Sequence, residues 1–408
     1  MTTSDQKAPM PWLIIACGCL ITALTFGPRS AMGFFQLPML ADTGWDRTTF
    51  GLAMALQNLC WGIGQPLIGA IADRYGTWRV LSLSALIYSA GLVLMAVADT
   101  PSMFYLGGGI LVGFGVAAGS FGIIFAAFAR NVPPEQRSFA FGLGTAAGSA
   151  GMFLFAPITQ GMIDAYGWSD TLVYLAILML VIPVLAIALR GNAKSGTQSS
   201  VEYEQTVRAA LREAFNHQSY LLLIAGFFVC GFHVAFVSAH FPAYVSDIGV
   251  SAKYAVLGFA LIGFFNIIGS LGSGIIGQRY PKPMLLVWLY LSRSITMALF
   301  LLLPQSGTSV IIFSVVLGLL WLSTVAPTNA LVAVMFGTRH LGLLGGIVFF
   351  SHQVGSFLGV WLGGYLFDTF GSYNPVWWLA VVLGLVAAVL HWPIHEAPVP
   401  RGAPMPAE

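Results

Sequence analysis

Two basic residues lie in the middle of long apolar segments, at matching places in the two halves of this chain. Arg29 belongs to the stretch GPRSAMGFFQLP, which ends at Pro38, and His233 belongs to GFHVAFVSAHFP, which ends at Pro242. An ionisable group at membrane depth costs about 2.5 to 3.5 kcal/mol on insertion scales, so it normally faces a partner or a water-filled path. The pair, 204 residues apart, therefore indicates a solute site.

Each basic residue shares a helix face with a second polar residue. Arg29 precedes Gln36 by seven residues, as His233 precedes His240, and positions i, i+4 and i+7 lie on one face of a helix. A guanidinium fork holds a carboxylate through two parallel hydrogen bonds. Because all 15 Asp and Glu residues fall in expected loops, tails or segment ends, we expect the substrate to supply the negative charge.

Other polar residues inside apolar segments complete the expected substrate-binding set. The set comprises Arg29, Gln36, His233, His240, His352, Gln57, Asn58, Asn266 and Asn329. Histidine titrates near neutral pH, so His233, His240 and His352 are also the candidates for proton coupling. Helix packing is the alternative role for the histidines and amides, since interhelical hydrogen bonds contribute about 1 kcal/mol. For Arg293, central in another segment, we expect structural pairing.

The elements that position these residues are membrane-spanning α-helices. Hydrophobic residues make up 57% of the 408 and charged residues only 8%, which is typical of a polytopic membrane protein. Apolar runs of about 20 residues or more, long enough to cross a bilayer, predict an all-α fold with twelve spans. They lie near 12–40, 48–71, 79–98, 103–129, 137–164, 169–189, 218–246, 252–277, 283–304, 307–335, 341–368 and 374–395.

The distribution of basic residues predicts the orientation. With the N-terminus inside, 13 of the 17 Lys and Arg residues fall in cytoplasmic loops or tails, as the positive-inside rule requires. The first apolar run has full spanning length and no cleavage pattern, so it is not read as a signal peptide. We expect an integral, multi-pass protein of the cytoplasmic (inner) membrane with both termini in the cytoplasm.

The chain divides once, at a polar stretch. We expect an N-terminal six-helix bundle over residues 1–190, a cytoplasmic linker over 191–217, and a C-terminal six-helix bundle with a short tail over 218–408. The halves match at an offset of 204 to 205 residues: GAIADRYG (69–76) answers GIIGQRYP (274–281), and MIDAYG (162–167) answers LFDTFG (366–371). An internal duplication of six helices explains both matches.

The loop after the second segment carries a family resemblance. In GAIADRYGTWR, residues Gly69, Asp73, Arg74, Gly76 and Arg79 have the spacing of the signature between helices 2 and 3 of the major facilitator superfamily. Within it the chain most resembles bacterial monocarboxylate and oxalate/formate carriers, although the helix-8 stretch FFNIIGSLGSG lacks the acid and arginine of many monocarboxylate carriers. The resemblance implies two bundles rocking about a midplane site, with helices 1, 4, 7 and 10 lining the cavity.

By the same resemblance, a charge network on the cytoplasmic side latches the bundles. Its expected gating residues are Asp73, Arg74, Arg79 and Arg137. The implied function is secondary active transport of a small, monocarboxylate-like organic anion, coupled to protons, by a protein working as a monomer. The alternative is an exporter of drug-like or other neutral metabolites by proton antiport.

Several classes of protein do not fit the sequence. The four cysteines lie in apolar segments without paired spacing, so neither disulfides nor a metal site is expected. A net charge of +2 does not favour a nucleic-acid partner. No nucleophile, base and orienting group stand at motif spacing, so we expect neither an enzyme nor a cofactor. A scaffold or sensor would typically add a soluble domain. The expected partners are the lipid bilayer, the anion and protons.

Overall fold

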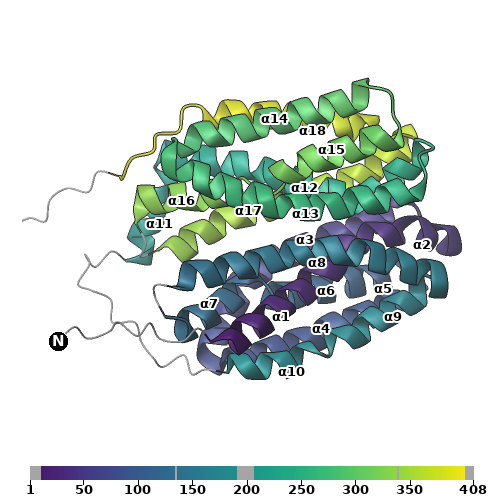
Figure 1. Ribbon diagram of the computed structural model, residues 1–408, viewed down its shortest axis with the longest axis horizontal. Coiled ribbons are helices and arrows are strands. Elements are labelled where there is room, and N and C mark those ends of the chain that lie inside the picture. The colour runs from purple at the N-terminus through teal and green to yellow at the C-terminus, as the bar shows by residue number, and fades with distance from the viewer. Residues whose placement is uncertain (1–10, 134–135, 191–205, 338–339, 400–408) are drawn as a thin grey trace, which may run out of the picture.

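The computed structural model describes residues 11–133, 136–190, 206–337 and 340–399, without the side chains of Asp73 and Ser138. Regular secondary structure in these ranges is helical. Figure 1 shows the helices in two layers, with the helices up to α10 in one and those from α11 onward in the other. The predicted all-α architecture is confirmed.

The N-terminal layer is built from six long spans, some of them broken. Its elements are α1 (Trp12–Ser30), η1 (Ala31–Phe35), α2 (Gln36–Thr43), α3 (Arg47–Tyr75), α4 (Thr77–Ala96), α5 (Pro101–Phe104), η2 (Tyr105–Leu111), α6 (Val112–Ala118), α7 (Phe121–Asn131), α8 (Arg137–Tyr166), α9 (Trp168–Met179), α10 (Ile182–Ala186) and η4 (Ile187–Leu189).

The C-terminal layer repeats this pattern after a short amphipathic helix. Its elements are α11 (Val207–Phe215), α12 (Gln218–Asp247), α13 (Ala252–Arg279), α14 (Lys282–Leu302), α15 (Gly307–Leu320), α16 (Val325–Phe336), α17 (Leu341–Phe370) and α18 (Asn374–His391). Helix α11 falls inside the predicted linker 191–217, of which residues 191–205 lie outside the described ranges.

Eleven of the helical segments in the described ranges are long and apolar enough to cross a membrane. The remaining predicted span, 48–71, is also a helix: α3 is 29 residues long. It carries Gln57, Asn58 and Gln65 and packs mainly against α17 of the other layer. Its weaker apolar character follows from this position, because a helix at the junction of two bundles meets protein on more sides than a helix facing lipid.

The two layers meet along α3 with α17 and α8 with α13, which Figure 1 shows running side by side. We call the end of the molecule near α11 the linker side, and the opposite end, with α2 and the start of α3, the far side. Inter-bundle contacts include Phe34 with Phe259, Trp61 with Phe349 and Phe153 with Phe264.

A close approach between η1 and α12, from different bundles, depends on two prolines and a glycine. Pro38 has no N–H for the carbonyl of Phe34, and just before it residues Ala31–Phe35 form a 3₁₀ helix. Pro242 likewise leaves the carbonyl of Ser238 without its helical donor. A Cβ on Gly33 would lie 2.5 Å from that carbonyl oxygen, so only glycine permits this contact between η1 and α12.

Candidate functional site

Arg29 lies in the last turn of α1, next to the 3₁₀ segment, and points to α3. Its Nη2 donates to Asn58 Oδ1, and its guanidinium carbon lies 4.5 Å from the ring centroid of Trp61. The Nε atom is buried and has no hydrogen-bond partner. These partners are a neutral amide and an aromatic face, so they position the positive charge without neutralising it.

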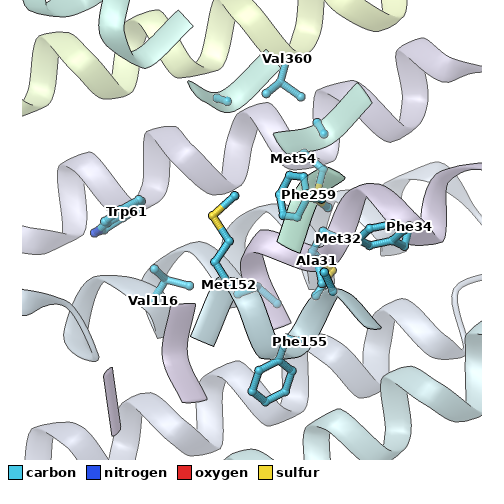
Figure 2. Packing of buried hydrophobic residues seen from close by; sticks show 14 of the residues in the cluster. Ala31, Met32, Phe34, Met54, Trp61, Val116, Met152, Phe155, Phe259 and Val360 are labelled. Atoms are coloured by element: carbon cyan, nitrogen blue, oxygen red, sulfur yellow. The ribbon is translucent and has the colours of Figure 1, made fainter. Parts of the chain in front are cut away.

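The guanidinium faces a cavity between the two bundles with a volume of about 20 Å³. That space suffices for a water molecule but not for an organic acid, so substrate binding requires the bundles to separate further. Lining residues come from both bundles: Arg29, Met32, Met54, Gln57, Asn58, Ala235, Ser238, Ala239 and Val360. Figure 2 shows Met32, Met54 and Val360 among the hydrophobic residues buried around this junction.

Polar residues of α3 support the arginine. Asn58 Nδ2 donates to the carbonyl of Met54 at 2.8 Å, which turns its Oδ1 toward Arg29. Gln57 Nε2 donates to the carbonyl of Gly108 at 3.0 Å and ties α3 to the glycine-rich η2. From α17, Gln353 Nε2 donates to the carbonyl of Asn58 at 3.1 Å. The sequence singled out Gln57 and Asn58, and the structure brings both together with Arg29.

Gln36 and His240 contact each other on the far-side flank of Arg29, because each follows the level of Arg29 or His233 by seven residues along its own segment. His240 Nε2 donates to the carbonyl of Val360 at 2.8 Å, so its Nδ1 is the acceptor for Gln36 Nε2 at 3.2 Å and for the Tyr373 hydroxyl at 3.0 Å. All three side chains are buried. This neutral triad joins the two bundles.

The other two histidines lie in the C-terminal bundle, apart from the cavity lining. His233 Nε2 donates to the carbonyl of Ala380 in α18 at 2.8 Å, and its Nδ1 has no partner. His352 Nδ1 is 3.0 Å from Gln353 Oε1, and its ring stacks on Phe349 with a centroid distance of 5.7 Å. The pairing of His233 with Arg29 across the cavity does not occur in this structure.

The two remaining amides differ in environment. Asn266 Nδ2 donates to Ser149 Oγ of α8 at 2.8 Å, and its Oδ1 accepts from the backbone N–H of Leu322 at 3.0 Å. It therefore joins the two bundles away from the cavity. Asn329 in α16 is exposed, and its Nδ2 donates to the carbonyl of Val325 in its own helix. Neither residue lines the cavity with Arg29.

Arg293 supports a break in a helix. Its Nε and Nη2 donate to the carbonyl of Leu320 at 3.2 and 2.6 Å, and Nη2 also donates to the carbonyl of Trp321 at 2.5 Å. These carbonyls lie at the end of α15, where the chain is interrupted before α16 begins at Val325. A cation at a helix C-terminus interacts favourably with its dipole, so the arrangement matches the structural pairing expected for Arg293.

A far-side ionic contact was not singled out from the sequence. Arg47 donates to both oxygens of Asp247, at 2.5 and 2.8 Å. Asp368 accepts from the backbone N–H groups of Arg47 and Thr48 at 3.3 and 2.6 Å, so a carboxylate of one bundle caps α3 of the other. The available signal was the placement of these acids and Arg47 at predicted segment ends on the same side of the membrane.

The expected gating residues lie on the linker side. Arg74 is exposed, with its guanidinium carbon 5.4 Å from the ring centroid of Tyr75, and Arg79 is also exposed. Arg137 Nε donates to the carbonyl of Val132 at 3.1 Å. The side chain of Asp73 lies outside the described part of the structure. Their role as a latch stays a prediction.

Two bundles of long apolar helices, joined around a charged cavity, define a membrane transporter. The chain belongs to the Major Facilitator Superfamily, whose family model matches residues 17–333, and it is a multi-pass integral membrane protein. The predicted family is confirmed.

Similar proteins agree with this assignment. The chain is 26% identical over 400 residues to the uncharacterized MFS-type transporter YcxA of Bacillus subtilis, covering 96% of each protein. It is 23% identical over 367 residues to monocarboxylate transporter 13 of Rattus norvegicus, covering 89% of this chain and 84% of the relative.

Solved structures of low identity show the same fold. A bacterial homolog of the human lysosomal transporter Spinster, inward-facing and unoccupied, matches with a TM-score of 0.74 and 14% identity, covering 94% of this chain and 97% of that one. A D-xylose–proton symporter matches with a TM-score of 0.73 and 17% identity, covering 96% and 98%.

Proposed function

We propose that this chain is a secondary active transporter that moves a small, monocarboxylate-like organic anion across the cytoplasmic membrane by alternating access, coupled to protons. The observation that carries the proposal is Arg29: a guanidinium with a buried, unpartnered Nε–H faces a cavity shared by both bundles. The described acids lie at or near helix ends or in loops, so a substrate carboxylate is the natural counter-charge.

The cavity walls favour a small acid with an apolar remainder. Met32, Met54, Ala235 and Val360 supply apolar surface, whereas Asn58, Gln57 and Ser238 supply neutral polar groups near the charge. One positive charge among neutral neighbours suits a monoanion better than a dianion. The relatives named monocarboxylate transporters support this class, and the structural likeness to a proton symporter is compatible with coupling.

Basic residues on the linker side suggest the orientation. Arg74 lies in the last turn of α3, Arg79 in the first turn of α4, and Arg208 and Arg212 in α11, and the positive-inside rule places such residues in the cytoplasm. In this orientation the Gln36–His240 contact and the Arg47–Asp247 ion pair close the path to the outside.

On the linker side we assign to Asp73, Arg74, Arg79 and Arg137 a latch that holds the two bundles together in the outward-facing state. Asp73→Asn should slow transport of L-lactate with little change in its affinity, because Asp73 lies at a helix end, away from the cavity lining. A large change in affinity with normal turnover would contradict the latch.

Purified protein and a panel of acetate, L-lactate, pyruvate and oxalate test the proposal. Ligands that bind the folded state raise its melting temperature, so at least one monocarboxylate should stabilise the wild type and Arg208→Ala but not Arg29→Ala. Arg208 is an exposed arginine of α11 and serves as the matched control. Uptake of the same acid into proteoliposomes should require Arg29 and respond to an imposed pH gradient.

The apolar part of the cavity wall also fits the alternative, export of neutral compounds by proton antiport. In that case transport would survive Arg29→Ala, and neutral apolar solutes rather than acids would stabilise the protein. If Arg29→Ala changes neither the binding nor the transport of any acid in the panel, the anion-carrier proposal is wrong.

A further inference from the structure

The seam between α3 and α17, where the two bundles meet, is tight on the far side and open on the linker side. Gly51, Gly62 and Gly69 share one face of α3, because steps of 11 and 7 residues are close to whole numbers of helical turns. A Cβ on Gly51 or Gly62 would lie 2.9 or 2.8 Å from an atom of α17. A Cβ on Gly69, or on Gly346 of α17, would have no atom of the described residues within 4 Å. The seam therefore opens beyond Gly62.

Trp61 lies where the seam begins to open. It is 7% exposed, Arg29 lies over one face of its ring, and Phe349 of α17 contacts the ring across the seam at a centroid distance of 5.3 Å. Its Nε1 is buried and has no hydrogen-bond partner among the described residues. Figure 2 shows this nitrogen at the end of the ring away from Met54, which lines the cavity. The indole N–H therefore points away from the cavity, toward the linker side.

Gln65 follows Trp61 by one helical turn and lies on the same side of α3. The residue is partly buried, and its Oε1 is buried without a partner in the described part of the chain. An amide side chain both accepts and donates hydrogen bonds. Because a buried polar group without a partner costs free energy, Trp61 Nε1–H and the Gln65 amide both favour a polar ligand at this point of the seam.

The N-terminus of α7 lies beside these two side chains. A Cβ on Gly122 would lie 3.9 Å from Gln65 Nε2. Phe121 stacks on Phe26, which contacts Trp61, with centroid distances of 4.6 and 5.5 Å. The first N–H groups of a helix have no partner within it, and no side chain of the described residues caps α7. Such a helix end carries partial positive charge and favours an anion.

Together these groups select a carboxylate with a small apolar remainder. The indole N–H, the amide and the start of α7 all offer N–H donors, and none of these residues is acidic. Phe121 and Phe349 supply apolar surface on either side of the indole. This is the chemistry of the Arg29 cavity without a full positive charge, so binding here should be weaker than at Arg29.

We propose that Trp61 Nε1–H, the Gln65 amide and the N-terminus of α7 form a second binding site for the carboxylate of the transported acid, on the linker side of Arg29. The inference rests on the proposed anion transport. The acid passes between the two sites around one indole ring, whose face holds Arg29 and whose edge carries the N–H. The second site opens when Phe349 separates from Trp61. A weaker site on this route divides the departure from Arg29 into two short steps.

Nuclear magnetic resonance of protein with isotope-labelled tryptophan tests the site, because an indole N–H proton shifts downfield when it donates to a carboxylate. Trp61→Phe keeps the aromatic ring and identifies the Trp61 signal by its loss. In Arg29→Ala, which removes the first site, L-lactate should still shift this signal downfield. Gln65→Leu in the same background should abolish the shift. Gln160→Leu, at a partly buried glutamine of α8 that donates to Asp164, should retain it.

Trp377 provides an internal control, because its Nε1 is also buried without a partner in the described ranges but belongs to α18 of the C-terminal bundle. Its signal should not move. Three results overturn the second site: no shift of the Trp61 signal in Arg29→Ala, a shift that survives Gln65→Leu, or equal shifts of the Trp61 and Trp377 signals.

The same measurements separate this inference from the proposed function. If L-lactate stabilises the wild type but not Arg29→Ala, and the Trp61 signal of Arg29→Ala does not move, the second site is wrong and the anion carrier stands. If the shift depends on Gln65 but Arg29→Ala changes neither stabilisation nor transport, the second site stands and the proposed role of Arg29 is wrong.

Transport measured from each side of the membrane locates the site. In inside-out and right-side-out vesicles, Gln65→Leu should raise the KM for L-lactate offered on the linker side about fivefold, the factor expected for one neutral hydrogen bond. The KM for L-lactate offered on the far side should not change, and Gln160→Leu should change neither value. A KM that rises equally on both sides overturns the linker-side location.

Discussion

Two arginines that lie within long apolar helical segments, one in each bundle, differ in what surrounds them: Arg29 is partly buried, whereas Arg293 is 1% exposed. Arg29 contacts an amide, an indole ring and a cavity, and its Nε–H has no partner. Arg293 is held by the carbonyls of Leu320 and Trp321 at the end of a broken helix. Side-chain partners can be exchanged for a ligand, whereas backbone carbonyls of a helix end need a donor in every state. The comparison supports the proposed recognition role of Arg29 and gives Arg293 a structural role at the helix break.

Removing each arginine tests this division, and the largest effect is expected at Arg293. Arg293→Ala leaves the carbonyls of Leu320 and Trp321 without donors in the protein interior, which should lower the free energy of unfolding by about 2 to 4 kcal/mol. Thermal unfolding in detergent would measure the loss. Arg29→Ala should change the melting temperature much less, and an equal loss in both variants would erase the distinction.

The next largest effect, on substrate affinity, is expected when the guanidinium of Arg29 is replaced by an ammonium group. Arg29→Lys keeps the charge but loses the planar fork, so the KM for the transported acid should rise about tenfold, or about 1.4 kcal/mol. Initial uptake rates over a range of acid concentrations would show it. A KM equal to that of the wild type would mean that Arg29 acts only as a point charge.

The aromatic face under Arg29 has a smaller role. Trp61→Leu retains an apolar side chain but removes a cation–π contact worth about 1 kcal/mol, so KM should rise about fivefold with little change in kcat. Phe26→Leu is a suitable control, because Phe26 contacts Trp61 with a centroid distance of 5.5 Å but is not among the cavity-lining residues. A lower kcat with an unchanged KM would instead mean that Trp61 contributes to the conformational change of the transport cycle.

A third arginine, Arg47, extends the comparison to the surface, where the smallest effect is expected. Its pair with Asp247 is partly exposed, with 30% side-chain exposure for the acid, and exposed pairs contribute about 0.2 to 1 kcal/mol. Asp247→Asn should therefore raise the population of protein that is open on the far side about threefold. The measurement is the rate at which an impermeant thiol reagent, added outside, labels Ser238→Cys in protein without its native cysteines.

Asp42→Asn provides the matched control for that measurement. Asp42 also lies on the far side, but it accepts from Trp168 Nε1 at 2.6 Å within the same bundle. Its loss should leave the labelling rate unchanged. An equal rise in both variants would attribute the effect to surface charge rather than to the inter-bundle contact.

The sequence was sufficient to predict the fold class and the six-plus-six arrangement of helices. Those features follow from apolar length and from an internal repeat. Even α3, which is not among the eleven most apolar segments, was expected as a span, because 48–71 is an apolar run of spanning length.

The neighbours of each polar residue could not be predicted in the same way. His233 and His240 share one face of α12, but α12 packs against elements of both bundles, and one histidine meets Gln36 while the other meets Ala380. On the other bundle, the 3₁₀ segment turns about 120° per residue instead of about 100°. Arg29 and Gln36 therefore lose the shared face that regular helix spacing predicted.

Gln36 and His240 occupy equivalent positions of the duplicated halves, 204 residues apart, and they touch each other. Two equivalent residues can meet only beside the axis that relates the halves. In an ancestral homodimer of six-helix subunits, this position would have faced its own copy, with identical side chains on both sides. In a single chain that carries both halves the two copies can differ, as Gln36 and His240 do, so this asymmetric hydrogen bond is accessible only to such a chain.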